Sequence, residues 1–216
     1  MRTLKLAVAA AALVASASTA QAAVNFTSTP LQVTAPTSLT LVTNFNGSPI
    51  SVAPSFTFTG GSLLTGTGAN GAEPAGDATQ YLSVLGNQTA TLAHTGPGSI
   101  TDLSVYIGSL DSYNKITFYG TGAFSGAGES LLGTDLTASP GGSHTDPLDN
   151  QRFNFTFTGG TVDEVAFYSG YNSLEIDNIA AAVPEPGTWA MMMVGLGLIG
   201  FMLRNNRKPK NQAVMA

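Results

Sequence analysis

Aromatic and hydroxyl residues alternate along two short runs in the interior of the chain. The runs are Ser55–Thr59 and Asn154–Thr158, and each ends in Gly-Gly. A period of two is typical of β-strands with one face buried and the other in water. Further short apolar runs, separated by Gly, Pro, Asn and Asp, predict strands at 39–44, 80–84, 90–93, 102–107, 115–119, 162–168 and 174–180. Away from the two ends no window of ten residues keeps a helical period. We therefore predict an all-β fold for residues 23–183, an antiparallel β-sandwich of jelly-roll type.

The N-terminal residues have the layout of a secretory signal peptide. Arg2 and Lys5 precede an apolar stretch from Leu6 to Ala17, and Ala20-Gln21-Ala22 follows. A charged region, an apolar region of about 12 residues and an A-x-A site are the parts of a cleavable export signal. We predict that residues 1–22 are removed between Ala22 and Ala23, and that the chain is exported.

Three different pieces follow one another at the C-terminus. Pro184-Glu185-Pro186 comes first, Trp189 precedes an uncharged run from Ala190 to Leu203, and a basic end covers residues 204–210. At 1.5 Å per residue the run reaches only about 21 Å, short of the ~30 Å hydrocarbon core of a bilayer. The pattern predicts a single hydrophobic transmembrane helix that holds the protein at the membrane temporarily, before processing.

This C-terminal segment closely resembles the PEP-CTERM sorting signal of Gram-negative bacteria, in the variant PEPxxWAMMxxGxGxxG. The matching residues are Pro184, Glu185, Pro186, Trp189 and Ala190, followed by the Met-Met pair, the spaced glycines and the basic end. The resemblance implies processing by exosortase, an integral-membrane cysteine protease, near the PEP motif. It also implies a location in the cell envelope, at the cell surface or in the extracellular matrix. The residues beyond Lys208 extend further than in many such signals.

The charge distribution separates the central domain from the two ends. Residues 23–183 hold twelve acidic residues but only Lys115 and Arg152 as bases, a net of −10. This excludes a nucleic-acid partner, since nucleic acids are bound by Lys and Arg at their phosphates. The chain has no cysteine and two histidines, so disulfides, thiol catalysis and a multi-histidine zinc site are also excluded.

The middle of the chain resembles a family of exosortase-dependent surface proteins. The resemblance lies in the segment Gly76–Val84 and in the turn Gly108–Asn114, which joins two apolar strands. It is completed by a predicted strand at 174–179 that contains acidic residues and an asparagine. Asp and Asn commonly close such turns by binding nearby backbone N–H groups, which is the structural interpretation of Asp111 and Asn114. The functional interpretation makes Tyr106, Asp111, Tyr113 and Asn114 contacts for a glycan.

Calcium and catalysis are two further hypotheses for the acidic domain. Oxygen ligands suited to calcium occur at Asp135, Asp146, Asp149, Asn150 and Asp177, but without a D-x-D-x-D-G spacing. A structural calcium ion is therefore one alternative, and a merely solvated acidic face is the other. No G-x-S-x-G elbow is present, and we expect no enzymatic activity.

Two functional classes remain after these steps. The first is a non-enzymatic surface or extracellular-matrix protein that exosortase sorts and that associates with exopolysaccharide or biofilm. The second is a carbohydrate-binding module that recognises a specific glycan, with exposed aromatic rings on a sheet or rim as its distinguishing feature.

Overall fold

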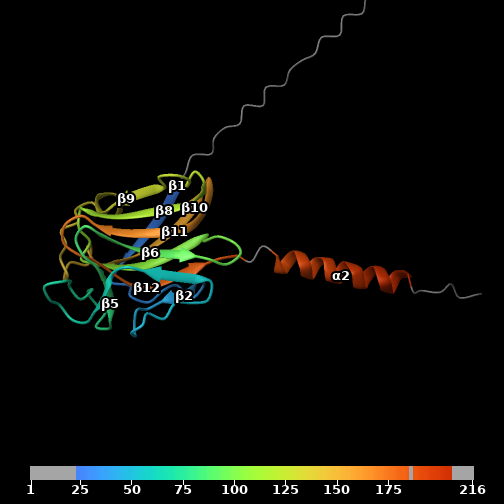
Figure 1. Ribbon diagram of the computed structural model, residues 1–216, viewed down its shortest axis with the longest axis horizontal. Helices are drawn as coiled ribbons and strands as arrows, with labels where there is room; N and C mark the ends of the chain where they lie inside the picture. Colours follow the sequence, from blue (N-terminus) through green and yellow to red (C-terminus); the bar gives the residue numbers. More distant parts are fainter. Residues whose placement is uncertain (1–22, 185–186, 206–216) are drawn as a thin grey trace, which may run out of the picture.

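The computed structural model describes residues 23–184 and 187–205, where most of the chain forms β-strands (Figure 1). In chain order these are β1 (Ala23–Pro30), β2 (Thr40–Thr43), β3 (Phe56–Thr59), β4 (Ser62–Leu64), β5 (Tyr81–Val84), β6 (Gln88–His94), β7 (Asp102–Gly108), β8 (Asn114–Gly122), β9 (Glu129–Leu132), β10 (Gln151–Thr158), β11 (Gly160–Ser169) and β12 (Leu174–Ala182). Two helices accompany them, the short α1 (Gly133–Leu136) and the C-terminal α2 (Thr188–Asn205).

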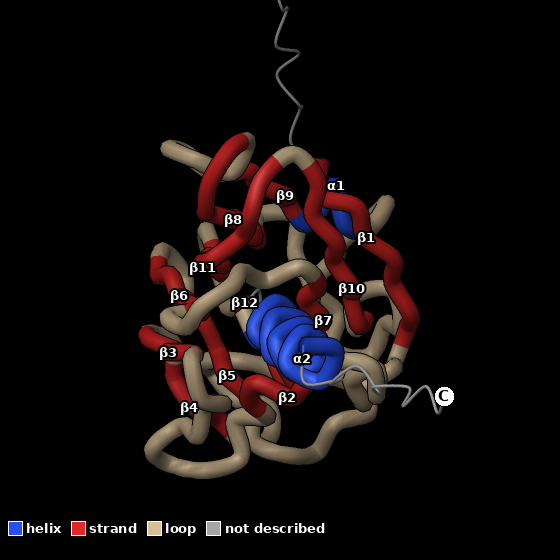
Figure 2. The backbone as a smooth tube through the Cα atoms, turned by 90° about the vertical axis from the view of Figure 1, so that its right-hand side faces the viewer, coloured by secondary structure: helices blue, strands red, loops and turns tan. Residues whose placement is uncertain are grey.

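The strands form two antiparallel sheets that pack face to face. The seven-stranded sheet has the order β1-β10-β7-β12-β5-β4, with β2 also paired to β12, and the five-stranded sheet has the order β3-β6-β11-β8-β9. Figure 2 shows β8, β11, β6 and β3 on one side of the molecule and β1, β10 and β7 on the other. The predicted all-β sandwich is thus confirmed, whereas its jelly-roll topology stays a prediction.

Aromatic side chains join the two sheets through the core. Phe118 of β8 lies 5.2 Å from Phe155 and 5.1 Å from Phe157 of β10, measured between ring centroids. Phe26 of β1 packs against Phe153 and Phe155 at 6.2 and 6.0 Å. Rings of this size supply much of the apolar area that the sandwich buries, and their tilted geometry is the favoured one.

Several elements differ from the sequence prediction. The strands β1, β4 and β9 and the helix α1 were not predicted, because they are short or lie at sheet edges. The two Phe-Thr-Phe-Thr-Gly-Gly runs belong to different sheets, as β3 and β10. Gly60 and Gly159 after them have φ of +80° and +84°, which glycine adopts readily. The two runs therefore share a sequence because both strands end in a turn that needs a glycine with positive φ.

The outer face of the seven-stranded sheet is polar yet buried. Along β10, Phe153 and Phe155 enter the core, so Arg152 points to the opposite side, where it is fully buried. Its Nε donates to the Gln32 carbonyl at 2.9 Å and its Nη2 to the Val33 carbonyl. Its Nη1 donates to Ser104 Oγ at 2.9 Å and to the Asn178 carbonyl at 3.0 Å. One guanidinium thus joins three strands to the segment after β1.

A second covering segment, residues 72–79, crosses the same face. The Tyr106 hydroxyl donates to the Ala75 carbonyl, and the Tyr106 ring lies 5.9 Å from the Arg152 guanidinium carbon. Asn178 Nδ2 donates to Asp77 Oδ2 at 2.9 Å. Burial lowers the pKa of Arg152 to about 10, although nearby Asp177 and Asp77 oppose this shift. Since the arginine remains charged at neutral pH, these carbonyls and carboxylates must stay in place around it.

A β-bulge in β12 shapes this buried polar layer. The pairing of β12 with β7 shifts between Asp177 and Ala180, and Asn178 has a φ of +48°, which asparagine tolerates. The Asn178 N–H donates to Asp177 Oδ1 at 2.6 Å, and Thr79 Oγ1 donates to Asp77 Oδ1 at 2.7 Å. Burial, together with the hydrogen bond and charge of Asp77, raises the pKa of Asp177 to about 8.

Replacing Arg152 with alanine should strongly destabilise the sandwich. The change leaves the carbonyls of Gln32, Val33 and Asn178 without their buried donor. We expect the free energy of unfolding to fall by about 3–5 kcal/mol, as when one partner of a buried charged interaction is removed. The matched control is Lys115→Ala, which removes the other base of the domain and a contact 5.2 Å from the Tyr168 ring centroid. That loss should stay near 0.5–1 kcal/mol in urea denaturation. Equal losses in both variants would contradict the role of Arg152.

The stability of the sandwich should fall as pH rises from about 4 to 8. In this range Asp177 keeps its proton in the folded protein, with a pKa of about 8, but loses it in the unfolded chain. The folded state then binds more protons, and the free energy of unfolding decreases with increasing pH. Asp177→Asn should flatten this slope because the amide can donate to Asp77 as the protonated acid does. Denaturation curves at several pH values measure the slope, and an unchanged slope in the variant would refute the assignment.

Candidate functional site

The segment between β12 and α2 is the first candidate site. β12 lies inside the seven-stranded sheet, and its last residue, Ala182, accepts a backbone hydrogen bond from Thr101 N at 3.0 Å. Val183 is partly buried against the core, whereas Pro184 is exposed. The sandwich thus fixes the chain up to Val183 and presents Pro184 at its surface.

The structure describes only some of the other residues of the predicted sorting motif. Glu185 and Pro186 lie outside the described residues, and so do Ala20 and Ala22 of the predicted signal cleavage site. Ala23 is the first residue of β1. Trp189 and Ala190 belong to the first turn of α2, which begins one residue after the turn at Gly187.

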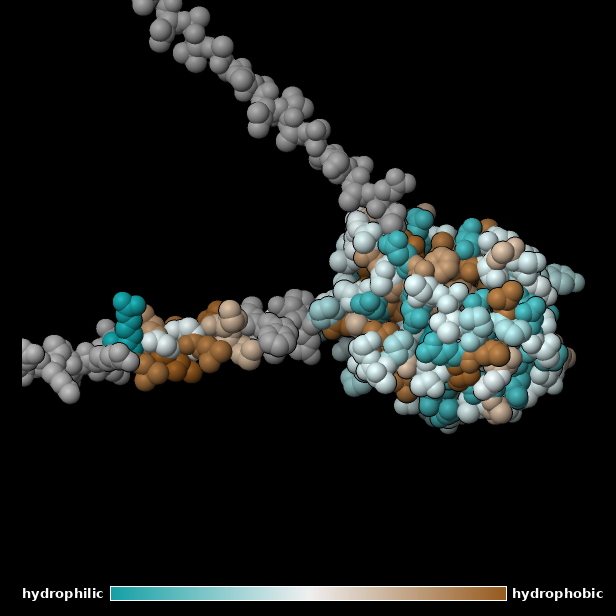
Figure 3. Space-filling view, turned by 180° about the vertical axis from the view of Figure 1, so that it is seen from behind, coloured by the Kyte–Doolittle hydropathy of each residue, from teal (hydrophilic) through white to brown (hydrophobic). Residues whose placement is uncertain are grey.

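Helix α2 extends away from the sandwich (Figure 1). It covers the predicted run 190–203 with two residues added at each end. Its apolar side chains are strongly exposed, with Met191 at 72 %, Leu198 at 60 % and Phe201 at 69 % of full exposure. In Figure 3 the projecting helix is mostly brown, interrupted by paler atoms, and stands clear of the mixed surface of the sandwich.

The expected transmembrane helix is not supported. In residues 23–184 and 187–205 no helix has both the length and the apolar character needed to cross a membrane. At 1.5 Å per residue, the 18 residues of α2 reach about 27 Å, and they include polar Thr188, Arg204 and Asn205. Three glycines lower the mean hydropathy of the helix further.

Two of the four predicted glycan contacts are corrected by the structure. Tyr106 and Asn114 are buried at 0 % and 1 % exposure, so neither side chain is accessible to a glycan. Asn114 Oδ1 accepts a hydrogen bond from Asp111 N at 2.7 Å, and its Nδ2 donates to Ser169 Oγ at 3.1 Å. Asn114 therefore closes the turn, as the structural interpretation predicted, and Tyr106 belongs to the buried polar layer.

The other two predicted contacts lie closer to the surface. Asp111 and Tyr113 are both partly buried, and the Tyr113 hydroxyl donates to Asp111 Oδ2 at 2.5 Å. Tyr171 is 83 % exposed and lies edge-on to Tyr113, with 6.0 Å between the ring centroids. The sequence alone does not single out Tyr171, because the contact between these two rings depends on tertiary structure.

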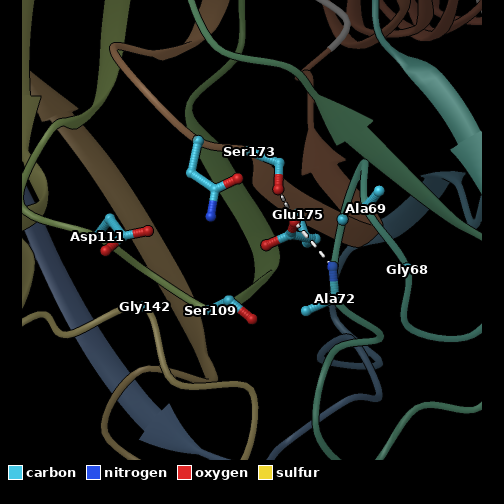
Figure 4. Close-up of a pocket in the computed structure, with 10 residues that line it drawn as sticks. Gly68, Ala69, Ala72, Ser109, Asp111, Gly142, Ser173 and Glu175 are labelled. Atoms are coloured by element: carbon cyan, nitrogen blue, oxygen red, sulfur yellow. Dashed lines mark hydrogen bonds between the residues drawn. The ribbon is translucent and has the colours of Figure 1, made fainter.

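A polar cavity opens beside Asp111 on the covered face of the seven-stranded sheet (Figure 4). It measures about 130 Å³, and its walls include Gly68, Ala72, Ser109, Asp111, Ser173 and Glu175. Figure 4 shows the Glu175 carboxylate near the centre, with Ser109 and Asp111 around the same space. Glu175 Oε1 accepts hydrogen bonds from Ala72 N at 3.2 Å and from the Ser173 hydroxyl.

Burial shifts the pKa of both carboxyl groups that line this cavity. Burial raises the pKa of Glu175 to about 7, and Asp111 adds to the shift by its negative charge. Burial also raises the pKa of Asp111, and Asp149 contributes in the same direction. Sequence reasoning missed Glu175. Glu175 lies two residues before Asp177, and residues at this spacing share one face of a strand. This spacing could have indicated that both acids lie on the same face of β12.

The five residues considered for calcium are not gathered into one site. Asp135 accepts a hydrogen bond from Leu132 N at 2.8 Å, and Asp149 accepts one from Ser143 N at 2.8 Å. Asp146 accepts one from Leu148 N at 2.9 Å, while Asn150 binds backbone groups and Asp177 lies in the polar layer. Within the described part of the chain, no three His, Cys, Asp or Glu residues assemble as a metal centre. Asp135, Asp146 and Asp149 thus close local turns, whereas Asn150 and Asp177 bind groups within the covered polar face.

Comparison with known proteins bears on the C-terminal segment. Residues 182–208 match the family model of the PEP-CTERM protein-sorting motif. The match begins at the last residue of β12 and covers the junction, α2 and the start of the basic end. No curated protein matches the chain. The chain therefore carries a PEP-CTERM protein-sorting motif at residues 182–208, which supports an exported protein associated with the cell envelope or surface and implies processing by exosortase.

Proposed function

We propose that the chain is a non-enzymatic surface or extracellular-matrix protein that associates with exopolysaccharide or biofilm after exosortase has processed it. The observation that carries this proposal is the position of the sorting motif, which follows directly where the folded sandwich ends. An enzyme that acts at this motif can separate an intact β-domain from the apolar helix without disturbing the core.

The geometry of the junction supports processing at this place. Pro184 is exposed, and prolines fix φ near −65°, so the motif resists incorporation into a helix. The residue before a proline also prefers an extended backbone, which suits binding in a protease active site. Because Val183 packs against the core, the sandwich limits how far the enzyme can reach toward the domain.

The composition of the domain supports a structural role without catalysis. The chain has no cysteine nucleophile, and its histidines, His94 and His144, lie far apart in the sequence. The His94 ring packs against Phe56, with 5.0 Å between centroids. A domain with a net charge of −10 remains soluble after release and is attracted to cations held in a polymer matrix.

Glycan binding is a second candidate function, favoured by one specific observation. The exposed Tyr171 ring, braced by Tyr113, stands beside the polar cavity that Asp111 and Asn172 line. An exposed ring next to hydrogen-bonding side chains offers both stacking and hydroxyl recognition to a sugar. This arrangement supports a carbohydrate-binding module that recognises a specific glycan.

Changing Glu185 to alanine should block processing. The substitution removes the only acidic residue of the sorting motif but leaves the sandwich and α2 unaltered. We expect the variant to accumulate at the larger, uncleaved size in a host that has exosortase, as wild-type protein should in a host without the enzyme. Asp163→Ala, a charge change on β11 in the other sheet, is the matched control and should be processed normally. Immunoblots of envelope and secreted fractions report the sizes. Normal processing of Glu185→Ala would refute recognition of the motif.

Replacing Tyr171 with alanine should strongly weaken glycan binding if the second candidate is correct. Loss of one stacking ring should weaken affinity at least tenfold on a glycan array, because stacking contributes most of the exposed apolar contact there. Tyr119→Ala, a partly buried tyrosine on β8, is the control and should bind like wild type. Absence of any glycan signal from the wild-type protein would remove this candidate and leave the first proposal intact.

A further inference from the structure

Two buried polar atoms in one cavity have no hydrogen-bond partner among the described residues. They are Glu175 Oε2 and Ser109 Oγ, whose residues are 1 % and 5 % exposed and line the cavity of about 130 Å³. A buried polar atom without a partner is energetically costly, and more so when it is charged, so native proteins rarely retain one. Two such atoms facing the same space indicate a ligand that satisfies both.

The missing partner must supply positive charge or hydrogen-bond donors. Asp111 adds a second carboxylate to the cavity, and a third, Asp149, accepts a hydrogen bond from Gly141 N at 3.2 Å, beside Gly142 of the cavity wall. Neither base of residues 23–183 lines this cavity. Arg152 donates to three backbone carbonyls and Ser104, and the Lys115 ammonium lies over the Tyr168 ring. The negative charge of this cavity is therefore not balanced by a lysine or arginine of the domain.

We propose that this cavity binds a calcium ion through the carboxylates of Asp111 and Glu175 and the hydroxyl of Ser109. All three donors are oxygen, which suits a hard cation, and the cavity walls hold no histidine or cysteine for zinc. The two carboxylates balance the charge of the ion. Calcium fits better than magnesium because it accepts irregular geometry and six to eight oxygens, with water completing the shell.

This site differs from the five positions that the sequence offered for calcium, and it does not depend on sorting or glycan binding. Only two acidic side chains contribute, which agrees with the absence of a three-residue metal cluster from the described residues. Sites with few charged ligands in extracellular modules bind calcium with Kd of about 10⁻⁴–10⁻³ M. An exported protein meets calcium at concentrations where such a site fills. The competing explanation is that Glu175 carries a proton and the cavity holds no ion.

Calcium titration of the full-length protein after treatment with EDTA tests the proposal. Isothermal titration calorimetry should give one site with Kd of about 10⁻⁴–10⁻³ M, and calcium should raise the Tm by mass action. Terbium bound in place of calcium should luminesce when tyrosine is excited, since Tyr113 donates its hydroxyl hydrogen bond to Asp111. Excess calcium should then quench that signal.

Matched variants distinguish calcium binding from protonation of Glu175. Glu175→Gln keeps the shape and hydrogen-bonding capacity of the side chain but should weaken calcium binding at least tenfold. Ser109→Ala should weaken it by a smaller factor, and it serves as a second test if Glu175→Gln does not fold. Asp163→Asn removes one charge outside the cavity and should bind like wild type. If the wild-type protein binds no calcium at a concentration tenfold above the upper Kd of about 10⁻³ M, the proposal is overturned. Unchanged affinity in both cavity variants would overturn it as well.

Discussion

The structure depends on satisfying one buried guanidinium. Arg152 points away from the aromatic core, and two covering segments close over it on the outer face of the seven-stranded sheet. Carbonyls from the segment after β1 and from the bulge in β12 accept its hydrogen bonds, so both must be correctly placed for the charge to be buried. An unsatisfied charge there would cost more than the sandwich gains from a few core contacts. The apolar core holds the two sheets together, and Arg152 fixes what lies outside them.

This covered face explains which parts of the prediction succeeded. Strands with clear alternation, such as the one containing Phe155, were predicted correctly because one side of each faces the core. Tyr106 has the same local pattern as a solvent-facing residue, yet residues 72–79 cover it. Local sequence periodicity cannot predict that one segment covers another, because the covering depends on contacts between segments far apart in the chain. The same limit hid the neighbourhood of Asp111 and Glu175, which the pairing of β12 with β7 and β5 creates.

The C-terminal segment shows the opposite behaviour. Its interpretation rested on order and composition alone, and the match at residues 182–208 agrees with it. A sorting signal must be recognised outside a folded core. Its recognition therefore depends on the local order of residues, which the sequence shows directly. The structure adds that Val183 packs against the core whereas Pro184 is exposed. It also shows that α2 buries little of its apolar surface, so the sandwich gains little packing from it.

The two acids of β12 on the covered face illustrate how one layer can serve both stability and binding. Asp177 accepts hydrogen bonds from the Thr79 hydroxyl and the Asn178 N–H and lies beside Asp77, so its burial serves the structure. Glu175, two residues earlier, has one oxygen paired and the other directed into a cavity that also contains Ser109 and Asp111. Identical burial thus has different consequences, because the covering segment fits closely over Asp177 but leaves space over Glu175. A site of this kind arises where a polar face is covered incompletely, and the loop Gly68–Ala72 sets the dimensions of the space that remains.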